Sequence, residues 1–126
     1  MAIHKFVYNT QVCTATQPRT IAEALPLLNN QHVTWIDVDE KVTTEQLHTL
    51  TKHFALHPVI IDEITKKNLR PRVEYFEKYI FVIAKMLRPT NDKRMFSMEQ
   101  VSFVIADNFL ISFQQGKKGD VFDGLR

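Results

Sequence analysis

Two histidines and two acids gather in one short stretch of the chain and have the chemistry to bind a metal ion. His53 and His57 stand four residues apart, and Asp62 and Glu63 follow closely. In zinc protease helices a glutamate directly follows the first histidine, but here that position is Phe54. A proline also interrupts the helix directly after His57. A metal-dependent hydrolase is therefore only the enzymatic alternative, and we expect His57 to cap the next helix or stand at its entrance.

The adjacent carboxylates of Asp62 and Glu63 are the kind of group that hard cations such as Mg²⁺ bind, directly or through water. The same acids are spaced for helical ion pairs, Asp62 with Lys66 and Glu63 with Lys67. Such pairs contribute only about 0.2–0.5 kcal/mol each. From residue types alone the ion pairs are the simpler interpretation, because charges on helix surfaces are usually just solvated.

Other chemistries find little support in the sequence. The four basic residues after the acids have no aromatic residues interleaved for base stacking, so no nucleic-acid partner is expected. A formal net charge of +2 does not indicate a particular class of partner either. The serines in strand-like stretches lack the Gly-x-Ser-x-Gly pattern, and no glycine-rich phosphate loop exists, so we expect no enzyme. The basic residues are Lys66, Lys67, Arg70 and Arg72, and the serines are Ser97, Ser102 and Ser112.

The length of 126 residues, with 44% hydrophobic and 24% charged residues, predicts one globular domain over residues 1–126. A single cysteine, Cys13, fits a reducing compartment, which favours a cytoplasmic location. The chain has no recognisable secretory signal, and its longest apolar runs, at 59–61 and 80–84, are far shorter than the ~20 residues that span a bilayer.

Three helices are expected where apolar residues recur at helical spacing. The first two follow capping-box patterns, Thr20 with Glu23 and Thr43 with Gln46, and the third begins at a proline. The expected helices are a short one after Thr20 that Pro26 interrupts, one over 44–56 and one over 57–68.

Strands are expected where apolar residues alternate and β-branched or aromatic residues are frequent. The pattern predicts an α/β (α+β) domain with a mixed, largely antiparallel sheet covered by helices. A tight turn is expected at Asp107-Asn108 and a longer polar connection at 88–94. The expected strands are 2–8, 11–16, 32–38, 72–76, 79–87, 97–106 and 109–114.

Five strings of residues, in order from Trp35 to the end, resemble the amino-terminal domain of the CorA magnesium and cobalt transporters. They are WIDVDE at 35–40, HPVIIDEI at 57–64, RPRVEYFEKYIFVIAKML at 70–87, EQVSFVIADNFLISFQ at 99–114 and GDVFDGLR at 119–126. The resemblance implies the CorA soluble-domain fold and a regulatory, magnesium-sensing domain on the cytoplasmic side of the cell (inner) membrane. It also implies a homopentamer, in which this domain contacts neighbouring subunits and its own downstream stalk and transmembrane region.

In the family the string GDVFD opens the helix that leads to the stalk and membrane helices. Here Asp120, Phe122 and Leu125 predict a helix that begins and is not finished, so we expect the chain to lack those later parts.

Asp62 and Glu63 match an acidic pair that, in the family, contributes to an intersubunit regulatory Mg²⁺ site with acids from downstream helices. Family members usually have Glu-Asp where this chain has Asp-Glu, which exchanges the reach of the two side chains. We expect weak Mg²⁺ binding by the isolated domain for this reason. The alternatives are a ZntB-like zinc transporter domain, which shares the architecture, and a free-standing soluble binding module.

Overall fold

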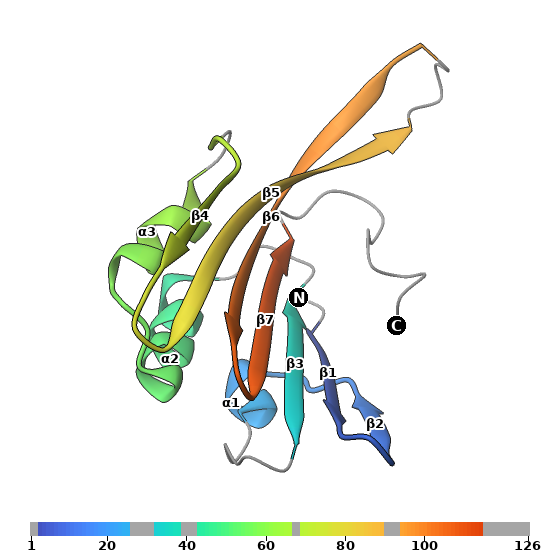
Figure 1. The fold of residues 1–126 in the computed structure, drawn as a ribbon, viewed down its shortest axis with the longest axis vertical. Helices are drawn as coiled ribbons and strands as arrows, with labels where there is room; N and C mark the ends of the chain where they lie inside the picture. The colour runs from blue at the N-terminus through green and yellow to red at the C-terminus, as the bar shows by residue number, and fades with distance from the viewer. Residues whose placement is uncertain (1–2, 26–31, 39–42, 67–68, 90–93, 115–126) are drawn as a thin grey trace.

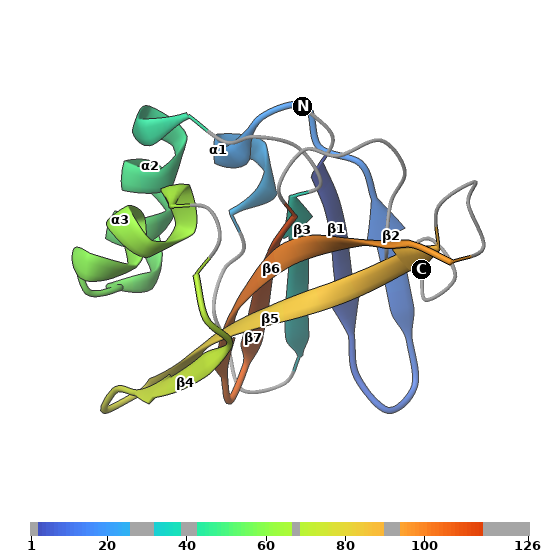
Figure 2. The ribbon, with the colours of Figure 1, turned by 90° about the horizontal axis from the view of Figure 1, so that it is seen from above.

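The computed structural model describes residues 3–25, 32–38, 43–66, 69–89 and 94–114. Within them the chain forms a seven-stranded sheet in the order β2-β1-β3-β7-β6-β5-β4. The three described helices lie on one face of that sheet (Figure 2). The elements are β1 (Ile3–Tyr8), β2 (Cys13–Thr16), α1 (Ile21–Ala24), β3 (Val33–Val38), α2 (Thr44–Phe54), α3 (Val59–Thr65), β4 (Arg72–Tyr75), β5 (Tyr79–Pro89), β6 (Phe96–Ala106) and β7 (Phe109–Gln114).

The sheet is antiparallel at every described pairing except β3 with β7, which run parallel. After β3 the chain forms α2 and α3, enters the far edge as β4, and returns strand by strand to β7 beside β3 (Figure 1). A parallel pairing requires such a crossover, and here the crossover carries the two larger helices over the sheet. The predicted mixed, largely antiparallel sheet with covering helices is confirmed.

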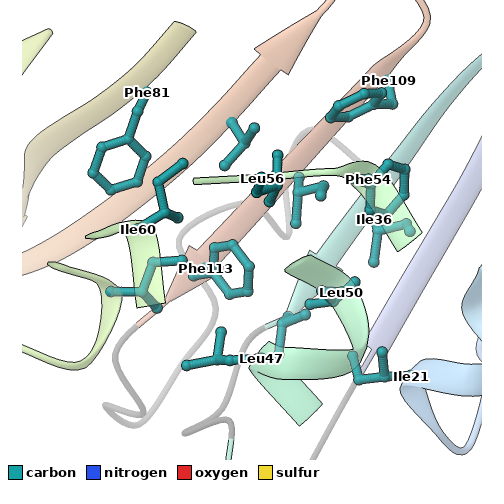
Figure 3. Close-up of a cluster of buried hydrophobic side chains, with 14 of the residues drawn as sticks. Ile21, Ile36, Leu47, Leu50, Phe54, Leu56, Ile60, Phe81, Phe109 and Phe113 are labelled. Carbon is teal, nitrogen blue, oxygen red and sulfur yellow. The ribbon is translucent and has the colours of Figure 1, made fainter. Parts of the chain in front are cut away.

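One buried apolar cluster joins the helices to the sheet (Figure 3). Leu47 and Leu50 from α2 and Ile60 from α3 are each 1% exposed. They lie among side chains of the strand face beneath, where Ile36 and Phe81 are fully buried. Burying apolar surface is the dominant favourable contribution to folding, so this cluster fixes how α2 and α3 lie on the sheet.

Both predicted capping boxes lie at helix starts. The Thr43 hydroxyl accepts the Gln46 N–H at 3.2 Å, and the Gln46 side chain accepts the Thr43 N–H at 2.9 Å. At α1 the Thr20 hydroxyl accepts the Glu23 N–H, whereas the Glu23 carboxylate accepts the N–H of Arg19 instead of Thr20. The first helix is therefore capped, with its reciprocal bond displaced by one residue.

The second and third helices are shorter than predicted. The expected helix over 44–56 ends at Phe54, because Ala55 adopts a left-handed conformation with φ of 54° and its N–H bonds to the Thr51 carbonyl. Of the described residues in the expected helix over 57–68, those of Val59–Thr65 are helical, and residues 67–68 lie outside the described part of the chain. Lys66 is already extended, at ψ 149°.

Strands β5 and β6 are longer than predicted and form a two-stranded ribbon that projects beyond the rest of the sheet (Figure 1). Their pairing continues from Tyr79 with Ala106 to Pro89 with Phe96. The polar connection predicted over 88–94 is therefore wrong at its start, because residues 88–89 are paired with β6 as the last residues of β5. Asp107 and Asn108 form the expected tight turn between β6 and β7. The helix expected from Asp120 lies outside the described residues.

The left-handed Ala55 generates a stability prediction. A left-handed conformation costs an L-residue roughly 1–2 kcal/mol, while glycine adopts it freely at a cost of about 0.5–1 kcal/mol in unfolded-state entropy. We expect Ala55→Gly to raise the free energy of unfolding by about 0.5–1 kcal/mol, measured by urea denaturation. The matched control Ala84→Gly, within β5, should lower it by a similar amount. A destabilised Ala55→Gly protein would contradict this prediction.

Candidate cation site

The helix that carries the acid pair, α3, begins at a capped turn after Pro58. The His57 ring nitrogen Nδ1 accepts the N–H of Val59 at 3.1 Å, which satisfies a donor at the start of the helix. The backbone N–H of His57 donates to the phenol oxygen of Tyr79 on β5 at 2.7 Å. His57 therefore caps α3, as predicted, and the same residue attaches the start of α3 to the sheet.

The other histidine of the pattern, His53, lies in the last turn of α2, and its ring meets the ring of Phe54 edge-on at 4.9 Å between centroids. Within the described parts of the chain, no group of three or more His, Cys, Asp or Glu side chains is placed to hold a metal ion. The structure does not bring the two histidines and two acids together as one site.

Asp62 and Glu63 point to different environments although they are adjacent. Asp62 is exposed, and no hydrogen bond or ion pair from the residues that the structure describes reaches its carboxylate. Glu63 is only 8% exposed. The reason is helical spacing, since Glu63 follows the buried Ile60 by three residues and precedes the buried Ile64. The sequence contained this signal, because the two isoleucines mark the inward stripe of the helix.

Two cationic side chains of the chain itself flank the inward acid. Arg72 Nη2 lies 2.7 Å from Glu63 Oε2, and Lys66 Nζ lies 3.7 Å from Glu63 Oε1. Arg72 Nε is in turn 3.0 Å from Glu74 Oε1. The expected pairing of Asp62 with Lys66 is therefore wrong, because Lys66 has already left the helix in an extended conformation and its ammonium group lies against Glu63. The expected partner Lys67 lies outside the described residues.

Magnesium prefers six oxygen ligands in a tight octahedral shell, several of which are commonly waters. Asp62 fits this requirement as one exposed carboxylate that approaches an ion directly or through water. Glu63 does not fit as it stands, because both of its oxygens face cations of the chain. The acid pair thus offers one available carboxylate and one engaged carboxylate.

Gln100, which the sequence reasoning missed, fixes the far end of α3. This side chain on β6 is 3% exposed. Its Oε1 accepts the N–H of Leu69 at 2.8 Å, and its Nε2 donates to the carbonyl oxygen of Lys66 at 3.0 Å. A buried amide between two chain segments holds both segments, because each of its groups requires a partner. Residues at both ends of α3, His57 and Lys66, are therefore tied to strands of the sheet.

A second buried polar group lies on the opposite face of the sheet. The Ser112 hydroxyl accepts from Trp35 Nε1 at 2.8 Å and donates to the Asp37 carboxylate at 2.7 Å. Gln114 Nε2 also donates to both Asp37 oxygens, at 3.1 and 3.3 Å. Ser112 is fully used in this network, which gives it a structural role.

The sequence of this chain matches one protein family and one characterised relative. The family described as CorA-like Mg²⁺ transporter protein matches residues 30–122. The cobalt/magnesium transport protein CorA of Thermotoga maritima is 34% identical over 108 residues, which cover 84% of this chain and 30% of that protein. This chain thus spans less than a third of that relative's length.

Solved structures share the fold at lower identity. The full-length CmaX protein superposes with a TM-score of 0.68 at 15% identity, over 92% of this chain and 35% of that one. The complete CorA magnesium transporter of Methanocaldococcus jannaschii gives 0.60 at 18%, over 94% and 33%. The soluble domain of the same transporter gives 0.59 at 20%, over 93% and 41%. No helix in the described part of this chain has the length and apolar character needed to cross a membrane.

The role of Gln100 is testable by stability. Gln100→Leu removes the partners of the Leu69 N–H and the Lys66 carbonyl, and a lost hydrogen bond in such a partly buried place costs about 0.5–1.5 kcal/mol. We expect the free energy of unfolding to fall by roughly that amount in urea denaturation. The control Gln11→Leu, in the exposed turn between β1 and β2, should stay within about 0.5 kcal/mol. Equal effects of the two substitutions would argue against a role for Gln100 in holding the end of α3.

Proposed function

Because this chain belongs to the family of CorA-like Mg²⁺ transporter proteins, we propose that it is the cytoplasmic regulatory domain of a channel for Mg²⁺, with Co²⁺ as a second transported ion. The family match over residues 30–122 carries this proposal. In it, the chain is part of a homopentamer in the cell membrane and contacts neighbouring subunits and its own membrane-spanning region. The transported cation is the substrate, and the domain's function is to sense the cation on the cytoplasmic side.

Asp62 is the residue that we place at the sensing surface. It is exposed on α3. Hydrogen bonds hold α3 on the sheet at His57 and again just after its last turn. The Asp62 carboxylate therefore moves together with the whole domain. A regulatory Mg²⁺ supplies the positive charge that holds Asp62 near carboxylates of an adjacent subunit. An ion that binds only the closely packed arrangement stabilises that arrangement by mass action. When cytoplasmic Mg²⁺ falls, facing carboxylates repel each other and the ring loosens.

The isolated chain should bind Mg²⁺ weakly. One accessible carboxylate supplies few of the six ligands, and the second acid is paired with Arg72. Calorimetric titration of the 126-residue chain with MgCl₂ is expected to give a dissociation constant in the millimolar range, near −4 kcal/mol or weaker. A tight one-to-one isotherm would show that this chain alone completes a site.

Flux measurements test the proposed function directly. Internal Mg²⁺ is expected to inhibit flux through the full-length transporter reconstituted in vesicles. Asp62→Asn should raise the half-inhibitory concentration of internal Mg²⁺ by roughly tenfold, which is a typical coupling between two sites. Glu77→Gln, an exposed acid in the turn between β4 and β5, is the control and should behave like wild type. Unchanged inhibition in Asp62→Asn would remove the residue from the mechanism. Flux of Zn²⁺ in place of Mg²⁺ and Co²⁺ would support the zinc transporter alternative.

A further inference from the structure

The ion pair between Glu63 and Arg72 joins α3 to the first residue of the edge strand β4. The Glu63 side chain is 11% exposed and that of Arg72 is 35% exposed. The distance of 2.7 Å between Nη2 and Oε2 is that of an ion pair in direct contact, although Glu63 Oε2 accepts no hydrogen bond of favourable geometry from the described residues. The pair is thus sheltered from water on its acidic side, where screening by solvent is least effective.

Arg72 is held from two directions. Its Nη2 contacts Glu63, and its Nε lies 3.0 Å from Glu74 Oε1 on the same strand. Two carboxylates on different elements therefore attract the same guanidinium, although Arg72 Nε donates no hydrogen bond of favourable geometry within the described residues. Moving Arg72 away from Glu63 therefore disturbs two ion pairs at once.

The remaining Glu63 oxygen also faces a positive charge, since Lys66 Nζ is 3.7 Å from Oε1. A divalent cation that coordinates Glu63 directly would come within a few Å of both the guanidinium and the ammonium group. Like charges at such separations repel strongly where water is partly excluded. Direct coordination of Glu63 thus requires Arg72 to leave, because Arg72 makes the shorter contact of the two.

We propose that Arg72 sets the concentration at which this surface binds a divalent cation. Its guanidinium pairs with the Glu63 carboxylate, so Arg72 and a divalent cation cannot both contact Glu63 at the same time. Asp62 is then the open carboxylate of the acid pair in the resting domain. This inference rests on the proposed function, because it concerns which residues of the sensing surface are available to a cation. In this proposal Arg72 competes with the cation for the Glu63 carboxylate.

A titration of the unmodified chain provides the first test. Side-chain carboxyl ¹³C resonances of Asp62 and Glu63 are followed by NMR as MgCl₂ is added, together with the Nε resonance of Arg72. The Asp62 signal should move with Mg²⁺ concentration, while those of Glu63 and Arg72 stay in place. Movement of both carboxyl signals at the same Mg²⁺ concentrations would overturn the proposal.

Removal of the competitor provides the second test, again by Mg²⁺ titration of this chain. Arg72→Met should lower the apparent Kd for Mg²⁺ by roughly tenfold, within the usual range of coupling between sites. Arg70→Met is the matched control, because it deletes the same charge from an exposed position two residues earlier. Adding Glu63→Gln to Arg72→Met should return the affinity to the wild-type value, which identifies Glu63 as the released ligand.

If Arg70→Met and Arg72→Met raised the affinity for Mg²⁺ equally, the gain would come from the lower net charge alone. That result would refute the proposal. If circular dichroism shows Arg72→Met to be unfolded, Glu63→Asp replaces it: the side chain is one methylene shorter, keeps the carboxylate and draws it back from Arg72. Glu63→Asp should also bind Mg²⁺ more tightly, and unchanged binding there would refute the proposal as well. Failure of these binding tests leaves the flux result for Asp62→Asn intact, and an unaffected flux leaves the binding results intact, so the two proposals fail separately.

Discussion

The burial of one sheet face beneath α2 and α3 is the constraint on which the rest of the structure depends. It requires the apolar stripe of α3, with Ile60 and Ile64, to face the strands. On a helix, that requirement also determines the direction of every neighbouring side chain. Glu63 is carried inward with the stripe and Asp62 is turned outward to solvent. The different chemistry of two adjacent carboxylates is therefore a consequence of core packing.

Buried polar groups then fix what apolar packing leaves adjustable. Apolar contacts are not directional, so they tolerate small shifts of a helix along a sheet. The Gln100 amide removes that freedom at the end of α3 because it must meet the Leu69 N–H and the Lys66 carbonyl together. Asp37 and Ser112, directly opposite each other across the parallel pair β3–β7, do the same for strand register on the other face. A slip of one residue would separate this acid from its donors.

Local patterns were sufficient to predict most of the elements from the sequence. Capping boxes placed the starts of the first two helices, and alternation placed β5 to β7, because these signals are contained within a few residues of each other. The parallel pairing of β3 with β7 and the bonds of Asp37 were not predictable in this way. Those bonds join residues 75 and 77 positions apart, and their partners are chosen by sheet order, which no local pattern encodes. Gln100 was missed for the same reason, since a glutamine in an alternating strand does not reveal what lies above it.

From the sequence, the acid pair has two interpretations, a cation site and ordinary helix ion pairs. In the structure each interpretation fits one of the two residues. Glu63 takes the ion-pair role, with Arg72 as a partner nine positions away that helical spacing could not supply. Asp62 remains open to solvent, as a cation-binding acid must be. A carboxylate that is paired with a guanidinium and one that is exposed to solvent differ in what a divalent cation must displace. The affinity of such a surface for Mg²⁺ is therefore determined as much by the chain's own cations as by the number of its acids.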